Sequence, residues 1–364
     1  MKDLVKKLNL AVKSPYYAIK TQKWLPYSKL LIKSDNSDWV LYSIVLEMDT
    51  VCNNIGVSTL NAKYFRFMKN QSIYYTSKYE VLSEWKKPKN RIGFPYYHGD
   101  PSTRPLFKNM INNLEKHHKD ISRIQVSHRH MESIILNTGI DSNKVFRIPI
   151  SIDLDSFLEV NLHHRSVSRK KLKIPEEAVL IGSFQKDGRG WKEGNEPKLI
   201  KGPDIFLQTI KILKDVIPDL HVLLTGPARG FVKTGLEKMG VPYYHYFLED
   251  YTDISQYYHA LDLYIVTSRE EGGPRSVLES MASGIPLVTT RVGQAMDLVE
   301  HEKNGWIVDV DDVEGLAYWS KYVIENSDSI KNIQAAARKT AEENCYSVQI
   351  PIWKKFMKGF VKIN

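Results

Sequence analysis

The chain has 364 residues, a net charge of +9 and 42% hydrophobic residues. This length and composition fit a globular protein with two cores and exclude a chain that is too polar to fold. No apolar run reaches the roughly 18 residues that a membrane-spanning helix needs. The only two cysteines, Cys52 and Cys345, lie far apart in the sequence. We therefore expect a reduced, cytoplasmic protein without a disulfide framework or a cysteine-based metal site.

The positive charge is concentrated at the two ends of the chain. Residues 1–33 hold eight Lys and one Asp, and residues 351–364 hold four Lys and no acidic residue, so the remainder has a net charge of −2. Both ends also contain aromatic residues, among them Trp24, Trp353 and Phe356. Lysines mixed with such rings suit a peripheral position at an anionic membrane surface, and a solvated basic face is the alternative. Without a nucleic-acid-binding motif, we expect no nucleic acid partner.

Short β-rich runs alternate with amphipathic patterns in the first 150 residues. Apolar residues at helical spacing predict a helix over 41–55, capped near 35–38, and further helices near 104–118 and 128–138. Such alternation is typical of a parallel sheet covered by helices on both faces. The predicted strands are 27–33, 71–77, 91–97, 123–127 and 145–150.

A second series of the same kind begins after residue 170. It contains a helix predicted over 203–216, with a proline in the first turn, where the missing N–H breaks no hydrogen bond. Two doubly wound α/β halves therefore follow one another, with a polar junction between them. The predicted strands of this half are 179–184, 221–225, 243–247, 261–267, 285–290 and 305–309.

The segment from Ser268 to Gly284 is the most informative in the chain. It holds a glycine-rich loop, a short helix, and two carboxylates, Glu271 and Glu279, with seven residues between them. Open α/β sheets bind ligands where a strand ends in such a loop, and the following helix offers N–H groups to an anion. Carboxylates accept hydrogen bonds from hydroxyls, which are the main polar groups of sugars. An ordinary strand–helix unit with charged loop residues would give the same pattern.

This segment resembles the donor-site signature of retaining nucleotide-sugar glycosyltransferases of the GT-B fold, family 4 (glycosyl transferases group 1). The resemblance extends over roughly 120–345 and is poor over 1–100, where no Gly-Gly loop follows the first predicted strand. It implies an α/β protein with two Rossmann-like domains that face each other across a cleft. The implied parts are an atypical acceptor-side domain over 1–150, a junction over 151–172, a donor-binding domain over 173–345, and a helix over 346–364 that returns to the first domain.

The resemblance also assigns roles to the residues of the donor site. It implies that Glu271 contacts the donor sugar, that Glu279 contacts the nucleotide ribose, and that Lys201 and Gly202 bind the diphosphate just before a helix. Further donor contacts are expected from a cation in the preceding loop, either Lys186 or Arg189, and from glycine-rich loops at strand ends. The residues expected in those loops are Gly226, Gly272, Gly273, Pro274, Arg275, Ser276 and, as a weaker candidate, Gly293.

Acceptor chemistry is expected from the first domain. His98 follows a predicted strand and resembles the histidine found in the first domain of several family members, which makes it our candidate for a sugar contact or a proton transfer. Asp100 is the alternative, whereas His128 and His130 read as surface or packing residues. A histidine at a strand end can equally have a structural role.

Two Asp-x-Asp patterns, Asp153–Asp155 and Asp309–Asp311, have the form of a diphosphate-bound metal site in other glycosyltransferases. One falls in the predicted junction and the other at the end of the last predicted strand. Because a lysine and helix N-termini are available for the diphosphate, we expect neither a metal nor another cofactor.

Together these observations predict a metal-independent hexosyltransferase that transfers a sugar from a nucleoside diphosphate sugar to a glycan or lipid-linked acceptor, as in polysaccharide assembly. Retention of the anomeric configuration follows from the resemblance alone. Three alternatives stay open: a sugar-nucleotide epimerase of the same fold, a non-catalytic sugar-nucleotide binder, and a membrane-surface-binding protein on an α/β scaffold.

Overall fold

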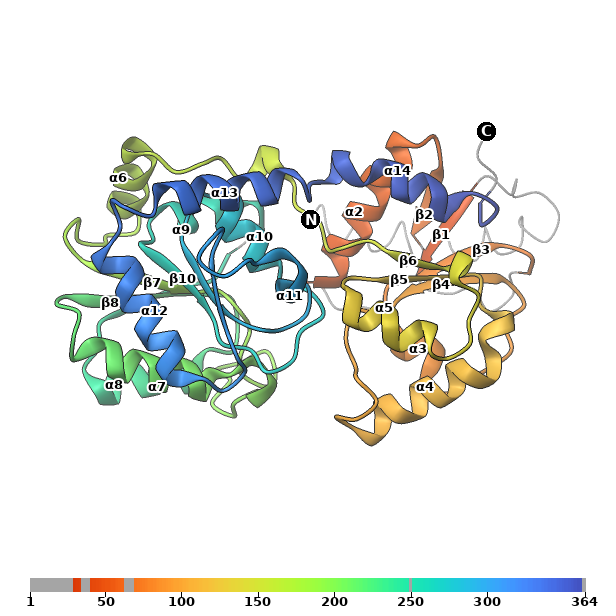
Figure 1. The fold of residues 1–364 in the computed structure, drawn as a ribbon, viewed down its shortest axis with the longest axis horizontal. Helices are drawn as coiled ribbons and strands as arrows, with labels where there is room; N and C mark the ends of the chain where they lie inside the picture. The colour runs from red at the N-terminus through yellow and green to blue at the C-terminus, as the bar shows by residue number, and fades with distance from the viewer. Residues whose placement is uncertain (1–28, 34–39, 62–68, 249–250, 362–364) are drawn as a thin grey trace. The chain divides into compact units, whose positions relative to one another are not determined.

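The computed structural model describes residues 29–33, 40–61, 69–248 and 251–361. They form two compact units, each built on a parallel six-stranded sheet (Figure 1). Unit 1 comprises Met1–Pro149 and Tyr346–Asn364, and unit 2 comprises Ile150–Cys345. The chain therefore contributes to unit 1 twice, at its beginning and at its end.

The sheet of unit 1 has the strand order β2-β1-β3-β4-β5-β6, and each neighbouring pair is parallel. The order reverses between β1 and β3, as in flavodoxin-like sheets. The strands are rich in Ile, Val, Leu, Phe and Tyr, and most of their side chains are buried, because helices cover both faces. Their bounds are β1 (Lys29–Lys33), β2 (Ser58–Asn61), β3 (Ser72–Tyr75), β4 (Arg91–Pro95), β5 (Arg123–Val126) and β6 (Val145–Arg147).

Two hydrophobic cores lie on the two faces of this sheet. One contains α2 (Val40–Asn54) and α14 (Tyr346–Met357), whose Trp353 and Phe356 are fully buried. The other contains α3 (Tyr79–Leu82), α4 (Pro105–His117) and α5 (Arg129–Leu136). Because the aromatic rings of the C-terminal segment belong to the first core, they are not available to a membrane surface. The prediction that these rings contact a membrane is therefore wrong.

The sheet of unit 2 has the strand order β12-β11-β10-β7-β8-β9, again with parallel neighbours. In chain order within the unit this is 6-5-4-1-2-3, the arrangement of dinucleotide-binding Rossmann sheets. The order reverses between β7 and β10. The bounds are β7 (Val179–Ser183), β8 (Leu220–Thr225), β9 (Tyr243–Tyr246), β10 (Leu263–Val266), β11 (Leu287–Thr290) and β12 (Trp306–Val308).

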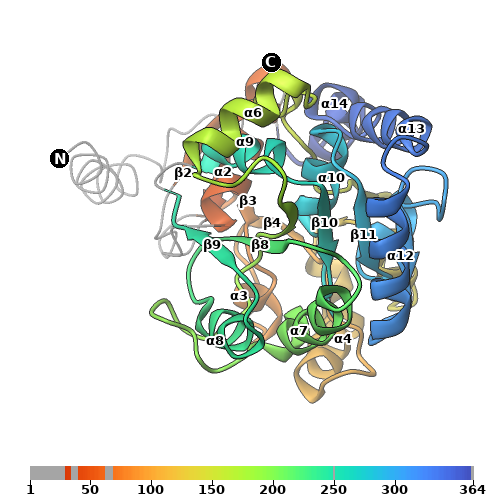
Figure 2. The same cartoon turned by 90° about the vertical axis from the view of Figure 1, so that its left-hand side faces the viewer.

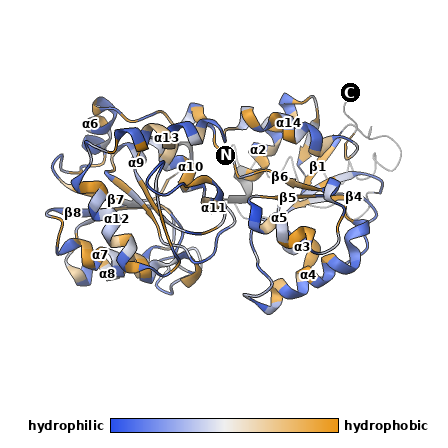
Figure 3. Ribbon diagram, in the orientation of Figure 1, coloured by the Kyte–Doolittle hydropathy of each residue, from blue (hydrophilic) through white to orange (hydrophobic). Residues whose placement is uncertain are grey.

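Helices cover both faces of this second sheet, as Figure 2 shows. The strands carry mostly apolar residues, and the helices mix apolar and hydrophilic residues (Figure 3). On one face lie α7 (Pro203–Lys214), α8 (Gly230–Met239) and α12 (Val313–Glu325). On the other lie α6 (Leu162–Lys171), α9 (Ile254–His259), α10 (Arg275–Ala282) and α13 (Lys331–Glu342), and the short α11 (Ala295–Leu298) follows β11.

Short 3₁₀ turns connect several of these elements. The turn Leu199–Lys201 matters most, because it leads directly into α7. The others are His118–Asp120, Ser142–Lys144, Leu154–Ser156 and Tyr251–Asp253.

The sequence predicted most of these elements. Of the twelve strands in the described residues, eleven coincide with a predicted run, and β2 is the one that the sequence did not indicate. The stretch 151–172, predicted as a junction, lies within unit 2 and contains the 3₁₀ turn Leu154–Ser156 and α6. The predicted cap near 35–38 and residues 1–28 of the basic segment 1–33 lie outside the described residues.

Candidate functional site

The reversal of strand order in unit 2 falls between β7 and β10, which are parallel neighbours. Loops that leave two such strands diverge, and the crevice between them is the usual ligand site of open parallel sheets. Gln185 follows β7 and Ser268 follows β10. The Ser268 Oγ lies 3.0 Å from Gln185 Oε1 and 3.0 Å from Glu271 Oε1. The carboxylate singled out from the sequence therefore lies where this fold places ligands.

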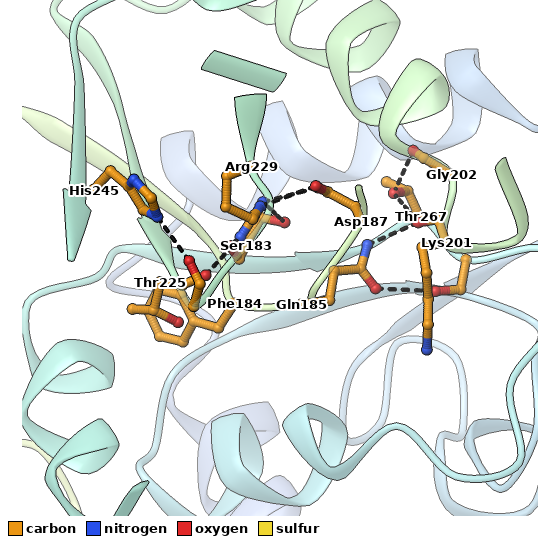
Figure 4. A network of polar contacts seen from close by, with 12 residues as sticks. Ser183, Phe184, Gln185, Asp187, Lys201, Gly202, Thr225, Arg229, His245 and Thr267 are labelled. Atoms are coloured by element: carbon orange, nitrogen blue, oxygen red, sulfur yellow. Dashed lines mark hydrogen bonds and ion pairs between the residues drawn. The ribbon is translucent and has the colours of Figure 1, made fainter. Parts of the chain in front are cut away.

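Lys201 joins this group from a third segment. Its Nζ forms an ion pair with Glu271, and the two side chains are only 21% and 12% exposed. Gln185 Nε2 donates a hydrogen bond to the Lys201 carbonyl at 2.8 Å (Figure 4). Two residues predicted from separate motifs are thus brought together. Such a pair can bind an anion through the ammonium and sugar hydroxyls through the carboxylate.

Gly202 has a steric reason to be glycine. Its φ of 63° is left-handed, and a Cβ at this position would lie 1.9 Å from the carbonyl oxygen of Thr267. The Thr267 hydroxyl donates to the Gly202 carbonyl at 2.9 Å (Figure 4). The close approach of these two backbones aligns the start of α7 with the loop that carries Glu271.

The first turn of α7 already contains an acidic group, Asp204. Burial raises the pKa of its carboxyl, but hydrogen bonds from Arg269 and from the backbone N–H groups of Asp204 and Ile205 outweigh burial and lower it. Asp in a first turn is a common helix signal. Its arginine partner, 65 residues away in sequence, could not be inferred from local spacing.

The glycine-rich loop leads from Glu271 into α10. Pro274 is the N-cap of α10, so Arg275 and Ser276 form its first turn. A Cβ on Gly273 would lie 2.7 Å from the side chain of buried Gln294, and Gln294 donates its own backbone N–H to the Gly272 carbonyl at 3.2 Å. Packing therefore holds this loop close to the next strand–helix connection.

That connection contains Gly293, which has a φ of 51°. A Cβ on Gly293 would lie 2.7 Å from the Glu271 carbonyl oxygen. Gly293, the weaker candidate, therefore has a packing reason to be glycine, because it lies against the glycine-rich loop at Glu271 and Gly272.

Glu279, the second carboxylate, is almost completely buried. The Tyr251 hydroxyl donates to one carboxylate oxygen, and the Tyr258 hydroxyl donates to the other at 2.9 Å. Burial raises the pKa of Glu279, although the two tyrosines and the charge of Arg275 act in the opposite direction. Both oxygens thus have protein partners, and a ribose contact for Glu279 remains a prediction.

The loop between β7 and α7 holds both candidates for the first-loop cation. Burial lowers the pKa of Lys186, whose Nζ lies 3.7 Å above the ring of Trp191. Arg189 is more exposed and forms an ion pair with Glu196 at 3.1 Å. Backbone hydrogen bonds across the loop give it a hairpin-like form. Lys186 directly follows Gln185, whereas Arg189 lies further along the loop.

A buried ion pair that the sequence did not suggest supports the same loop. Asp187 and Arg229 are 1% and 0% exposed, and their N–O distance is 3.0 Å. Arg229 also donates to the carbonyls of Ser183, at 2.6 Å, and Thr225, at 3.0 Å (Figure 4). The arginine therefore ties the ends of β7 and β8 to the loop that carries Lys186.

Gly226 ends β8 in a left-handed conformation, with a φ of 82°. Its carbonyl accepts a hydrogen bond from His245 Nε2 at 2.8 Å. Burial lowers the pKa of His245, although the hydrogen bond to the Gly226 carbonyl acts in the opposite direction. No atom of the described residues lies within 4 Å of where a Cβ on Gly226 would be, so these residues leave space at this strand end.

In unit 1, His98 and Asp100 lie in the loop that follows β4. Asp100 is paired with His130, whose Nε2 lies 2.9 Å from its carboxylate. Burial raises the pKa of Asp100, but hydrogen bonds from Ser102 and His130 outweigh burial and lower it. His128 is buried, as expected for a packing residue. His130 is half exposed and contacts the candidate acceptor residue Asp100.

A buried lysine underlies the same loop. Lys78 is 3% exposed, and its Nζ lies 3.9 Å from the ring centre of Tyr96 and 4.8 Å from that of Phe107. The ring of Phe107 in turn lies 5.8 Å from that of His98. The acceptor-side candidates thus rest on a packed cationic and aromatic layer that the sequence did not reveal.

The two Asp-x-Asp patterns have local structural partners. Asp153 caps a 3₁₀ turn, Asp309 pairs with Arg291 at 3.0 Å, and Asp311 pairs with Arg269 at 2.6 Å. Within the part of the chain that the structure describes, no group of three or more His, Cys, Asp or Glu side chains could hold a metal ion. Among the same residues, no helix is both long and apolar enough to span a bilayer.

Residues 197–340 match the family model described as glycosyl transferases group 1, a region that includes Lys201, Glu271 and Glu279. The lipopolysaccharide core biosynthesis mannosyltransferase LpsB of Rhizobium meliloti (strain 1021) is 33% identical over 125 residues, which cover 32% of this chain and 36% of the relative. The D-inositol 3-phosphate glycosyltransferase of Corynebacterium urealyticum (strain ATCC 43042 / DSM 7109) is 26% identical over 237 residues, covering 60% of this chain and 51% of the relative. The matches thus span about a third to a half of these curated relatives.

The similarity to solved structures covers nearly the whole chain. The crystal structure of Anabaena Alr3699/HepE in complex with UDP and glucose aligns with a TM-score of 0.69 at 16% identity, covering 91% of this chain and 99% of that one. The two parallel sheets and this similarity confirm the predicted GT-B fold with two Rossmann-like domains.

Proposed function

We propose that this protein is a retaining glycosyltransferase that moves a hexose from a nucleoside diphosphate sugar to a hydroxyl acceptor without a metal ion. One observation carries the proposal. Lys201 and Glu271, from two separate motifs, form a partly buried ion pair at the strand-order reversal of unit 2, inside the region that matches the group 1 model.

In this proposal each residue of the pair has a distinct task. The Lys201 ammonium binds the diphosphate and stabilises the negative charge that grows on it as it leaves. Glu271 accepts hydrogen bonds from hydroxyls of the donor sugar and so fixes the position of the anomeric carbon. The backbone N–H groups at the start of α10 support the same phosphates. These positive groups are the reason we propose a metal-independent reaction.

The proposed reaction exchanges two bonds at the anomeric carbon. The bond to the β-phosphate oxygen breaks, and the acceptor oxygen forms its bond from the same face. The acceptor proton passes to the departing phosphate oxygen, so the enzyme needs no separate base. We infer retention from the resemblance of the Glu271–Glu279 signature to family 4.

The acceptor is proposed to be a glycan or a lipid-linked glycan that contacts His98 or Asp100 in unit 1. The LpsB relative, named for lipopolysaccharide core biosynthesis, supports this acceptor class. UDP-glucose is the first donor to test, because the HepE structure holds UDP and glucose. We place the reaction in the cytoplasm, and we assign any attraction to an anionic membrane surface to the lysines of the basic ends, because the C-terminal rings are buried.

The test is transfer from UDP-glucose, GDP-mannose and ADP-glucose to a panel of glycan acceptors, with and without EDTA. We expect an α-linked product, identified by NMR, from one donor at an equal rate in EDTA. A β-linked product would contradict retention, and loss of turnover in EDTA would contradict metal independence. Conversion of the donor without transfer would favour an epimerase, and nucleotide binding without any turnover would favour a non-catalytic binder.

A further inference from the structure

Arg269 connects three segments around the proposed donor site. Its guanidinium donates to both carboxylate oxygens of Asp204, at 2.8 and 2.7 Å, and its Nε donates to Asp311 at 2.6 Å. Its Nη1 also donates to the Leu199 carbonyl at 2.6 Å. Paired N–H bonds of this kind are among the strongest that side chains form. The side chain therefore links the loop after β10 to the start of α7 and to the end of β12.

The backbone strengthens the same connection. The N–H groups of Arg269 and Glu270 both donate to the Ile200 carbonyl, at 2.9 and 3.2 Å. Ile200 and Arg269 directly precede Lys201 and the Glu270–Glu271 pair, respectively. The two segments that carry the proposed catalytic ion pair are thus joined by backbone bonds, which do not depend on the Arg269 side chain.

The effect of the Arg269 side chain on the proposed donor site is therefore mainly electrostatic. Asp204 lies in the first turn of α7, three residues after Lys201, and Asp311 lies on the other side of Arg269. With Arg269 in place, these three groups carry a net charge of −1. Without it they would carry −2 beside the point where the proposed site must bind a diphosphate. The arginine is 26% exposed, so solvent screens its charge only in part.

We propose that Arg269 is a positioning residue for the donor diphosphate, which cancels the charge of Asp204 at the start of α7 so that the anion can bind beside Lys201. This inference rests on the proposed function and adds a residue outside the Glu271–Glu279 signature. It assigns Asp204 an opposing effect: its carboxylate occupies the N–H groups of the helix start and repels the phosphates.

Charge and structure can be separated by a double-mutant cycle. The variants are Arg269→Gln, Asp204→Asn and the combined Arg269→Gln/Asp204→Asn, which restores the wild-type net charge without restoring the guanidinium. Arg291→Gln is the matched control, because Arg291 forms a similar pair with Asp309 at 3.0 Å at the next strand end. UDP and GDP are the probes, with dissociation constants measured by titration calorimetry at low and high NaCl concentration, after circular dichroism has verified folding.

At low salt we expect Arg269→Gln to weaken diphosphate binding roughly fivefold and Asp204→Asn to tighten it roughly twofold, as for partly screened charges at a distance of several ångströms. The double variant should return to near the wild-type affinity, and all differences should shrink at high salt. Arg291→Gln should bind like the wild type. The tighter binding of Asp204→Asn cannot result from misfolding.

Equal weakening in Arg269→Gln and the double variant would overturn the proposal, because it would show that only the broken link matters. Wild-type affinity in Arg269→Gln, with UDP or GDP bound by the wild type, would also overturn it and leave the proposed function intact. If the wild type bound neither UDP nor GDP, nor any other nucleoside diphosphate, the proposed function would fail together with this inference.

Discussion

The two units are built from the same kind of parallel sheet. They differ in where the strand order reverses and in which side chains lie at that point. Unit 2 has the Rossmann order, and its reversal point between β7 and β10 holds Gln185, Ser268, Glu271 and Lys201 in one hydrogen-bonded group. In unit 1 the strand order reverses between β1 and β3, whereas the candidate acceptor residues His98 and Asp100 follow β4, and His130, which pairs with Asp100, follows β5. The group 1 match, over 197–340, lies entirely in unit 2.

This difference indicates how the proposed work is divided. A donor nucleotide is chemically similar across many glycosyltransferases, so the site that binds it retains a readable pattern. Acceptors differ widely, so the unit that binds them has less reason to keep one. Changes in unit 2 should therefore affect the use of the donor, whereas changes in unit 1 should affect only the use of the acceptor.

The largest effect is expected at the ion pair of unit 2. Glu271→Gln and Lys201→Ala should each lower the transfer rate by roughly a thousandfold, in the range measured for groups that stabilise a charged transition state. The folded state should remain intact, as measured by circular dichroism. Matched controls are Glu270→Gln, one position out of the signature, and Lys211→Ala, an exposed lysine of α7. Near wild-type rates in either site variant would break the assignment.

The buried Asp187–Arg229 pair, which supports the loop between β7 and α7, should matter for stability. Arg229→Met leaves Asp187 buried without its partner, which costs about 3 kcal/mol or more of the free energy of unfolding. Arg291→Met, which removes an exposed pair with Asp309, should cost less than about 1 kcal/mol. Urea denaturation of both variants provides the comparison. Equal, small losses would show that the Asp187–Arg229 pair does not hold the loop.

Changes in unit 1 should leave donor binding unaffected. His98→Asn and Asp100→Asn should raise the KM for the acceptor by roughly tenfold, as expected for the loss of one or two hydrogen bonds. The dissociation constant of the nucleoside diphosphate should stay at the wild-type value. A change in donor affinity in either variant would contradict the proposal that unit 2 alone binds the donor.

The smallest effect is a pH dependence from Glu279. Burial raises its pKa above the ordinary value of 4.5, so between these two values the folded state binds more protons than the unfolded state. The stability that Glu279 contributes is therefore present below pH 4.5 and declines as the pH rises through the raised value. Glu279→Gln should lack this decline. Parallel stability curves for the variant and the wild type would contradict the direction of the shift.

The sequence predicted the local features of this molecule better than its long-range pairs. Strand runs and the loop from Gly272 to Ser276 follow from spacing and composition, which are local. The Lys201–Glu271 contact could be expected only through the resemblance, because it joins two loops. The tyrosine partners of Glu279 and the Asp187–Arg229 pair depend on packing between distant segments. The strand β2 (Ser58–Asn61) was missed because it is short and three of its four residues are polar.

The proposed division of work requires a donor site that lies within unit 2. We would titrate UDP, GDP, ADP and CMP into the wild type, Lys201→Ala and His98→Asn by calorimetry in the presence of EDTA. We expect one nucleotide to bind the wild type and His98→Asn equally and to bind Lys201→Ala at least tenfold more weakly. Equal binding to the wild type and Lys201→Ala, or no binding by the wild type, would contradict a donor site in unit 2.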